Sequence, residues 1–298
     1  MRYAFLLAAL AFCAYGLITQ WSAIASALST LSAWTLLRAL AAGMVGLLCW
    51  MLGWRALLAG FGGPLPVAAC VRIMFLGQLG KYVPGSVWAV VGQVSLAREH
   101  GVPRAASASA TLLAMATTVA TGCAMAALTL PLASASAARD YWWALLLAPV
   151  LLSCLHPRVV TWALNLALRV VRQEPLSASP SLGSMVTAVL WTLLGWVFFG
   201  LHTWLLMPSG SALLATGAYS LAYVVGFLVI FAPGGLGARE VALTAALAPA
   251  LTQPAALVVA LSSRVVLTVA DLLWALVGNA MPKPVTKPVP AEDPQLPA

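Results

Sequence analysis

Charged side chains are scarce in this sequence. Asp, Glu, Lys and Arg together make up only 7% of the 298 residues, whereas soluble domains carry about 25%. A chain with so little charge cannot cover itself with a surface that water tolerates, so the bilayer is the solvent that suits it. Alternating barrel strands are also missing. The sequence therefore predicts an all-α fold, a polytopic bundle of membrane helices.

Acidic side chains are the rarest charged group. There are seven, and two of them lie in the C-terminal tail. Transferases usually need a carboxylate base or metal ligands, but the other acidic residues are scattered and no metal-binding spacing is found. Five cysteines, an odd number, lie in or beside apolar segments and do not suit a disulfide frame. We expect no enzyme activity, no cofactor and no metal; a membrane glycosyl- or phosphotransferase is an alternative.

Long uncharged stretches predict where the chain crosses the membrane. Residues 175–238 contain no Asp, Glu, Lys or Arg, and about 20 apolar residues suffice for one crossing. The stretch therefore holds two helices, separated by the turn at 207–211. The predicted long segments are 3–19, 32–52, 105–130, 141–155, 182–207, 212–231 and 255–280, with shorter, interrupted segments at 71–94 and 241–251.

Basic residues predict the orientation. They gather at 55–72, 98–104, 158–172 and 283–287, and Lys and Arg next to spans mark the cytoplasmic side. Both termini are then cytoplasmic in a bacterial inner membrane, which requires an even number of crossings. With seven long segments, one short segment must complete an eighth, so we expect about seven to eight spans.

The two ends of the chain are treated separately. The first segment also resembles a cleavable signal, but an uncleaved helix is the prediction because further spans follow at once. The membrane domain covers residues 1–281, and the Pro-rich tail, 282–298, is predicted to be disordered and cytosolic.

The first interrupted segment places a lysine beside a helix break. Pro84 removes a backbone donor and Gly85 releases the helix, a few residues after Lys81. Broken backbone at membrane depth is tolerated only against protein or a wet cavity. Lys81 would then lie beside free backbone dipoles and suit a phosphate. The alternative is an interfacial turn with a snorkelling lysine.

A second break leads into an Arg-Glu pair. Pro233, Gly234, Gly235 and Gly237 precede Arg239 and Glu240, which begin a new helix. Helix N-termini attract anions, and the planar fork of arginine matches phosphate oxygens. Glu240 is expected either to cap the helix or to hold Arg239 in place.

The two breaks recur half a chain length apart. Pro84-Gly85 is matched by Pro233-Gly234, and transporters are often built from repeats whose broken helices meet at the midplane. This pattern predicts two broken or re-entrant segments in an inverted repeat, with Lys81 and Arg239 close together. A coincidental recurrence is the alternative.

The last long segment carries two charges on one face. Arg264 and Asp271 are seven residues apart, which places them on the same side of a helix. Intramembrane charges usually face the bundle interior. We expect either structural ion pairs with other helices, or an anion-binding Arg264 with Asp271 as its counter-charge or a proton acceptor.

A basic stripe precedes the long uncharged stretch. Arg158, Arg169 and Arg172 recur at helical spacing opposite an apolar face, as in helices that lie on an anionic leaflet. A plain cytoplasmic connector is the alternative. We attribute the net charge of +8 to basic residues that set the membrane orientation and contact anionic lipid. No nucleic-acid partner is expected.

Together these motifs resemble a known family. The stretch from Leu79 to Gly85, the stretch from Pro233 to Glu240, and Arg264 look like the transmembrane domain of lysylphosphatidylglycerol synthases. The resemblance implies a flippase-like helix bundle with re-entrant segments, in a stand-alone member without the soluble aminoacyl-transfer domain, and lipid translocation as its activity.

The sequence thus predicts a protein that binds and translocates an anionic or polyprenyl-phosphate-linked lipid. Its headgroup would bind to Lys81, Arg239 and Arg264. A non-catalytic membrane partner of a lipid-modifying enzyme or glycosyltransferase is the alternative that the sequence does not separate from it.

Overall fold

The computed structural model describes residues 29, 31–83, 87–133, 139, 142–170, 180–229 and 237–282, and these form helices and turns only. The all-α prediction is confirmed for this part of the chain. Four helices, α3 (Ala33–Gly60), α6 (Arg104–Leu132), α10 (Leu182–Leu206) and α13 (Gln253–Ala280), are long and apolar enough to cross a membrane. The shortest has 25 residues, about 37 Å at 1.5 Å per residue, against roughly 30 Å of hydrocarbon.

Two pairs of shorter helices enclose the two predicted breaks. In the first pair, α4 (Val67–Gln78) continues into the 3-10 turn η1 (Leu79–Tyr82) and packs against α5 (Val87–Glu99). In the second, α11 (Ala212–Leu228) packs against α12 (Ala238–Ala246). We call these pairs the first and second hairpins. The helices on either side of each break therefore pack against each other.

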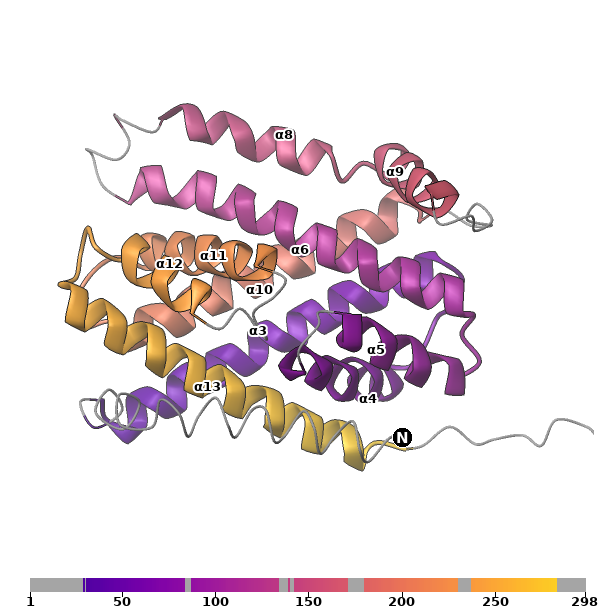
Figure 1. Ribbon diagram of the computed structural model, residues 1–298, viewed down its shortest axis with the longest axis horizontal. Helices are drawn as coiled ribbons and strands as arrows, with labels where there is room; N and C mark the ends of the chain where they lie inside the picture. The colour runs from indigo at the N-terminus through magenta and orange to yellow at the C-terminus, as the bar shows by residue number, and fades with distance from the viewer. Residues whose placement is uncertain are drawn as a thin grey trace, which may run out of the picture.

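The predicted span over residues 141–155 is replaced by shorter helical elements. Instead of one span over 141–155, the 3-10 turn η2 (Trp142–Leu146) leads into α8 (Leu147–Ser153), which ends before α9 (Pro157–Val170). Proline disfavours helical geometry in the residue before it, so a helix stops ahead of Pro157. Figure 1 shows α8 along the side of α6 that faces away from α13.

The predicted number of spans is met only in part. Besides the four long helices, α11 has 17 residues, about 26 Å, which is less than the hydrocarbon thickness. The predicted segment 241–251 corresponds to α12, which ends at Ala246 and is followed by a turn. The predicted first span, 3–19, and all of the tail after residue 282 lie outside the described residues.

The two halves of the described chain repeat the same order of elements. A long helix, a hairpin and a second long helix occur first as α3 to α6 and again as α10 to α13. The packing follows this correspondence, because α6 lies against α11 while its counterpart α13 lies against α4. The counterparts α3 and α10 run antiparallel, with Gly46 facing Phe199 and Gly53 facing Thr192. The two counterpart helices that cross at the centre therefore run in opposite directions.

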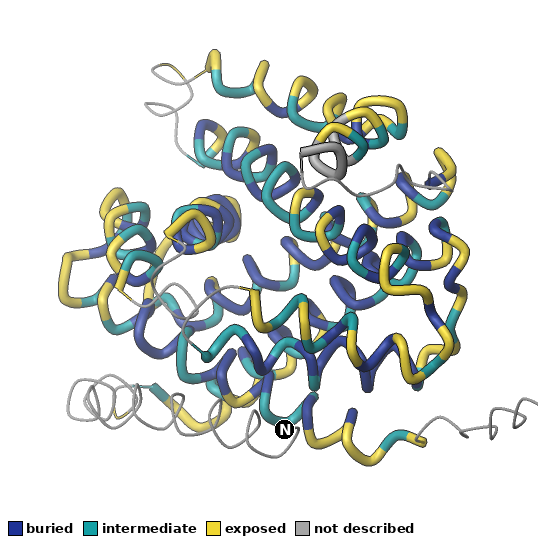
Figure 2. The backbone as a smooth tube through the Cα atoms, turned by 45° about the vertical axis from the view of Figure 1, so that its right-hand side comes forward, coloured by how far each residue is buried: buried dark blue, intermediate teal, exposed yellow. Residues whose placement is uncertain are grey.

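Aromatic side chains fill the crossing of α3 and α10. Trp50 packs edge-on against Trp196 and Phe199, with ring centroids 4.9 and 4.7 Å apart. Gly46 leaves the space that the Phe199 ring occupies. Figure 2 shows the buried residues in the centre and exposed residues along the outer helices. Many of those exposed side chains are large and apolar, including Trp34, Leu190 and Leu276, as lipid contact requires.

Candidate functional site

A cavity of about 370 Å³ lies among the two hairpins and the four long helices. Its aromatic wall comes from Trp50, Trp54 and Phe199, and its charged wall comes from η1, α12 and α13. Lys81, Arg239 and Arg264 all line it, as does Asp271. The structure therefore brings the three basic residues singled out in the sequence to one space.

The charges on α13 lie far from both ends of that helix. Arg264 is eleven residues after Gln253 and Asp271 nine before Ala280, about 16 and 14 Å from the respective ends. A helix of 28 residues is about 42 Å long. Both side chains are thus at the depth of the hydrocarbon if α13 crosses the membrane, where unpaired charge is unfavourable.

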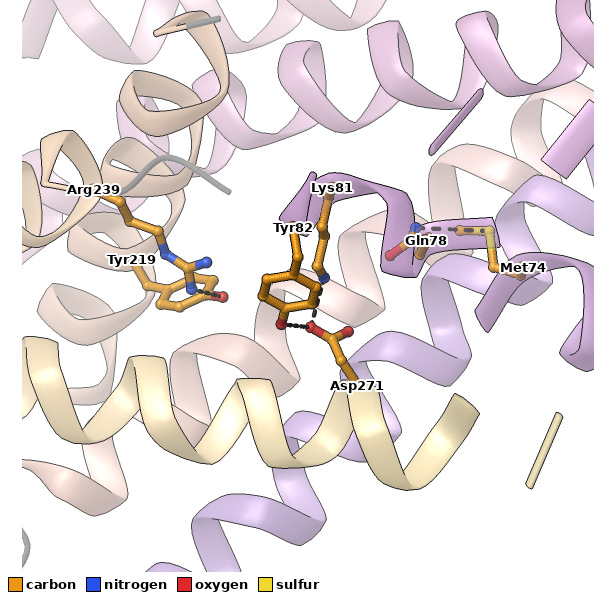
Figure 3. A network of polar contacts seen from close by, with 7 residues as sticks. All are labelled: Met74, Gln78, Lys81, Tyr82, Tyr219, Arg239 and Asp271. Atoms are coloured by element: carbon orange, nitrogen blue, oxygen red, sulfur yellow. Dashed lines mark hydrogen bonds and ion pairs between the residues drawn. The ribbon is translucent and has the colours of Figure 1, made fainter. Parts of the chain in front are cut away.

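Asp271 is the counter-charge of Lys81. Its Oδ2 atom lies 2.6 Å from Lys81 Nζ and accepts a hydrogen bond of 2.7 Å from the Tyr82 hydroxyl. Figure 3 shows Lys81 and Tyr82 reaching from η1 to α13 side by side. The interpretation of Asp271 as the counter-charge of Arg264 is wrong, because the fold of the first hairpin places Lys81 against it.

Glu240 pairs with Arg264, and not with Arg239. Its Oε2 atom accepts a 2.7 Å hydrogen bond from the Gly237 N–H, so it caps α12 as one of the two alternatives predicted. Its Oε1 atom forms an ion pair with Arg264 Nη1. The other alternative, that Glu240 holds Arg239, is wrong because successive helix positions point in different directions.

Arg239 is held by aromatic rings. It donates a hydrogen bond from Nη2 to the Tyr219 hydroxyl, and its guanidinium lies 4.8 and 5.7 Å from the ring centroids of Tyr219 and Tyr223. Gly226 makes this possible, since a Cβ there would lie 2.9 Å from Arg239 Cβ. Among the described residues no carboxylate forms an ion pair with Arg239.

Among the described residues that line the cavity, one cation therefore has no carboxylate partner. Lys81 is balanced by Asp271 and Arg264 by Glu240, while Arg239 keeps its charge. The two stretches at the breaks that the structure does not describe, 84–86 and 230–236, contain no charged residue in the sequence. A buried cation without a counter-ion strongly favours an anion beside it.

Sequence reasoning missed the two tyrosines and a chain of hydrogen-bonded polar residues that also line the cavity. Tyr219 and Tyr223 are four residues apart in an uncharged helix, and that spacing is the signal that would have found them. In the polar chain, Trp54 donates to Thr111, and Thr111 donates to Gln93 at 3.0 Å. No sequence signal joins these three residues, because they come from three helices.

Other predicted residues lie away from the cavity or outside the described residues. Arg158 is exposed on α9, and the side chain of Arg169 on the same helix is not described. His202 is buried and its ring contacts the Ala39 carbonyl and the Ser263 hydroxyl, both at 2.9 Å, which is a packing role. Gly237 adopts a φ of +83° that suits glycine. The predicted residues outside the description are Pro84, Gly85, Arg172, Pro233, Gly234 and Gly235.

The sequence matches a family described as Lysylphosphatidylglycerol synthase TM region over residues 2–275. The chain belongs to this family. A search of curated proteins found no match. The matched region extends from before α3 to within α13. It therefore includes all four charged residues that line the cavity.

Proposed function

We propose that this lysylphosphatidylglycerol synthase TM region protein binds a lipid with a monoanionic phosphate headgroup in the cavity and moves it across the membrane. The observation that carries the proposal is the charge of Arg239, which no carboxylate of the described residues neutralises. A phosphodiester carries one negative charge, so its entry neutralises the cavity. Anionic phospholipids and polyprenyl-phosphate-linked lipids both contain such a group.

The size and lining of the cavity support a headgroup as the ligand. A volume of about 370 Å³ is at the small end of ligand pockets and leaves no room for lipid tails, which then stay in the bilayer. The Tyr219 and Tyr223 rings orient the guanidinium of Arg239, and a planar guanidinium matches two phosphate oxygens. No chemistry on the lipid is part of the proposal.

The repeated order of elements, with α3 and α10 running in opposite directions, supports translocation. Inverted repeats with a site between broken helices are typical of transporters that open alternately to either side. In this proposal the two hairpins are re-entrant, and each contacts α13 through one ion pair, Lys81–Asp271 or Glu240–Arg264. Movement of one half against the other would then expose Arg239 to one leaflet at a time.

An orientation follows from the distribution of charge over the ends of the bundle. Three helix ends lie together at one end of the bundle. The end of α3 meets the start of α10, where a Cβ on Gly60 would lie 3.0 Å from Ser184 Cβ. Gly63, which follows α3, lies near Val102, just before the start of α6. Arg98 and Arg104 belong to this end, and Figure 1 places α9 there too. We assign it to the cytoplasm by the positive-inside rule, with Arg158 on the anionic leaflet.

The test is lipid movement in liposomes that contain the purified protein and a fluorescent phosphatidylglycerol. Arg239→Ala should reduce both lipid binding and transfer at least tenfold, since a hydrogen bond to a charged group contributes about 1.5–3 kcal/mol. Arg98→Ala, which removes an exposed arginine at the end of α5, is the matched control and should behave as the wild type.

The outcomes separate the alternatives. Unchanged binding in the Arg239→Ala protein would contradict the site. Binding without transfer in the wild type would instead favour a non-catalytic partner of a lipid-modifying enzyme or glycosyltransferase, which would take the lipid from the same cavity.

A further inference from the structure

Uncharged polar side chains line the part of the cavity that adjoins the first hairpin. Gln78 on α4, Gln93 on α5 and Thr111 on α6 contribute them, and we call these three residues the polar patch. In Figure 3, Lys81 lies between Arg239 on one side and Gln78 on the other. The volume of about 370 Å³ corresponds to roughly a dozen water molecules at about 30 Å³ each. The cavity therefore has room for a second group attached to a phosphate at Arg239.

The two glutamine amides of the polar patch have only a weak partner for their nitrogens. Gln93 Nε2 donates to the Met74 sulfur at 3.3 Å, and Gln78 Nε2 donates to the same sulfur at 3.7 Å. A thioether is a weak acceptor, and each amide nitrogen has two hydrogens. Gln78 Oε1 accepts no hydrogen bond from any described residue. Because buried polar groups are normally well hydrogen-bonded, and Gln93 is 3% exposed, these amides suit a ligand that supplies stronger partners.

A chain of hydrogen bonds fixes the orientation of the Gln93 amide. Trp54 Nε1 donates to Thr111 Oγ1 at 3.1 Å, and Thr111 Oγ1 donates to Gln93 Oε1 at 3.0 Å. An indole can only donate and a hydroxyl has one hydrogen, so the amide oxygen faces Thr111 and the amide nitrogen points elsewhere. Gly77 lets Gln93 pack this closely, since a Cβ there would lie 2.6 Å from Gln93 Cγ. The donor is thus held in place before a ligand arrives, which lowers the cost of binding.

Two threonines supply acceptors to the same cavity. Thr118 Oγ1 donates to the Ala114 carbonyl at 2.9 Å, and Thr192 Oγ1 donates to the Ala188 carbonyl at 2.7 Å. Each hydroxyl has one hydrogen, so its oxygen remains an acceptor. A mixture of amide donors and hydroxyl acceptors matches ligand hydroxyl groups, which both donate and accept.

The charge balance of the cavity favours an uncharged second group. Asp271 is paired with Lys81, and Glu240 with Arg264, so neither carboxylate is left for an ammonium group on the ligand. Such a group would also cancel the phosphate charge that Arg239 attracts, and buried charge without a counter-ion is unfavourable. Hydroxyl groups add no charge and leave the phosphate to neutralise Arg239.

We propose that the polar patch is a second subsite, which binds the hydroxyl groups of an uncharged polyol or sugar attached to the phosphate. The lipid class that fits the whole cavity is then a phosphodiester with a hydroxyl-bearing headgroup. Arg239 binds its phosphate, and the amides of Gln78 and Gln93 select the alcohol beyond it. This inference rests on the proposed function of Arg239 as the phosphate site.

The experiment compares two short-chain lipids with identical acyl chains, phosphatidylglycerol and phosphatidylmethanol. Both are monoanionic phosphodiesters, and only the first has headgroup hydroxyls. Binding to the purified protein in detergent is measured by isothermal titration calorimetry. The wild type should bind phosphatidylglycerol about tenfold more tightly, as expected of two further hydrogen bonds between neutral groups.

Three variants assign the preference to the polar patch. Gln78→Met and Gln93→Met keep the length of the side chain and remove the amide. Each should lose most of the preference and bind phosphatidylmethanol as the wild type does, which also shows that the variant is folded. Gln253→Met makes the same change at an exposed position at the start of α13 and should retain the preference.

The two proposals fail in different ways. Equal affinity of the wild type for the two lipids, which needs no variant to observe, would overturn this inference and leave the Arg239 site intact. A preference that persists in both glutamine variants of the polar patch would do the same. No binding of either lipid, or binding of both that Arg239→Ala leaves unchanged, would overturn the proposed function and this inference with it.

Discussion

At the scale of single residues, the cavity is defined by which charges are paired. Asp271 and Glu240 each neutralise a cation from another element, and each has a second hydrogen bond, from Tyr82 or from the Gly237 N–H. These bonds fix the carboxylates on Lys81 and Arg264, so neither of them pairs with Arg239. Arg239 in turn depends on Tyr219, which supplies both a hydroxyl and a ring face.

The Glu240–Arg264 pair can be tested by its effect on stability. Both side chains are largely buried, so Glu240→Gln leaves an arginine unpaired in the protein interior and should reduce the free energy of unfolding by about 3–5 kcal/mol. The double substitution Glu240→Gln with Arg264→Gln should recover much of that loss, because no charge is then left unpaired. Chemical unfolding in detergent would measure both. Equal and additive losses from the two single substitutions would contradict the pairing.

At the scale of elements, glycines set how closely each hairpin closes. A Cβ on Gly77 would lie 2.8 Å from the Gln93 backbone nitrogen, and a Cβ on Gly80 would lie 2.6 Å from the Ala89 nitrogen. In the sequence, the glycine of this segment that is expected to release the helix is Gly85, and neither Gly77 nor Gly80 has an assigned role. In the structure they let two backbones touch, which is what places Lys81 within reach of Asp271.

Gly80→Ala is therefore expected to open the first hairpin. The added methyl group meets backbone atoms that cannot rotate away, and overpacking of this kind costs about 1–3 kcal/mol. We expect a lower thermal midpoint and weaker lipid binding, since Lys81 and Tyr82 follow directly in the chain.

A second glycine provides the control. Gly183 at the start of α10 has only the Ser181 hydroxyl nearby, at 3.8 Å, so Gly183→Ala should retain binding and leave stability unchanged or slightly higher. Similar behaviour of the two variants would show that the hairpin contact is not important.

At the scale of the whole molecule, the two ends of the bundle differ in charge. Arg98 at the end of α5 and Arg104 at the start of α6 lie at one end, where Figure 1 also shows α9, the helix that carries Arg158. The opposite end includes the uncharged loops 207–211 and 247–252, which meet where the Ser209 hydroxyl donates to the Ala250 carbonyl at 3.4 Å, and of the described basic residues Arg38 and Arg139 lie toward it. This bias is what the positive-inside rule predicts of a protein held in one orientation.

Cysteine labelling would test that orientation. In a background with all native cysteines replaced by alanine, Ser209→Cys should react with a membrane-impermeant maleimide on intact cells. Glu99→Cys, at the opposite end, should react only after the membrane is opened. The cysteine-free parent must stay unlabelled. The reverse pattern would mean that the bundle is inserted the other way round.

The membrane environment and the positions of the helix breaks follow from the order of residue types along the sequence. The lack of charge over residues 175–238 determines that the chain folds in lipid, and lipid permits only structures that satisfy their own backbone. The positions of the two breaks, of Lys81 and Arg239 beside them, and of Arg264 in the last long helix also follow from residue types alone. The length of the segment around Pro149 and Pro157 was not predictable, because apolar composition does not distinguish a crossing helix from two short ones.

Only the tertiary structure decided which charges neutralise each other. Tyr82 and Asp271 meet across 189 positions of the chain, and such a contact depends on how the first hairpin folds back against α13. On a single helix, Arg264 and Asp271 share a face and look like partners. Packing gave each of them a partner from another element, and within the described part of the chain Arg239 contacts rings and no carboxylate. Charge pairing is a property of distances in space, so the free cation could not be identified from the order of residues.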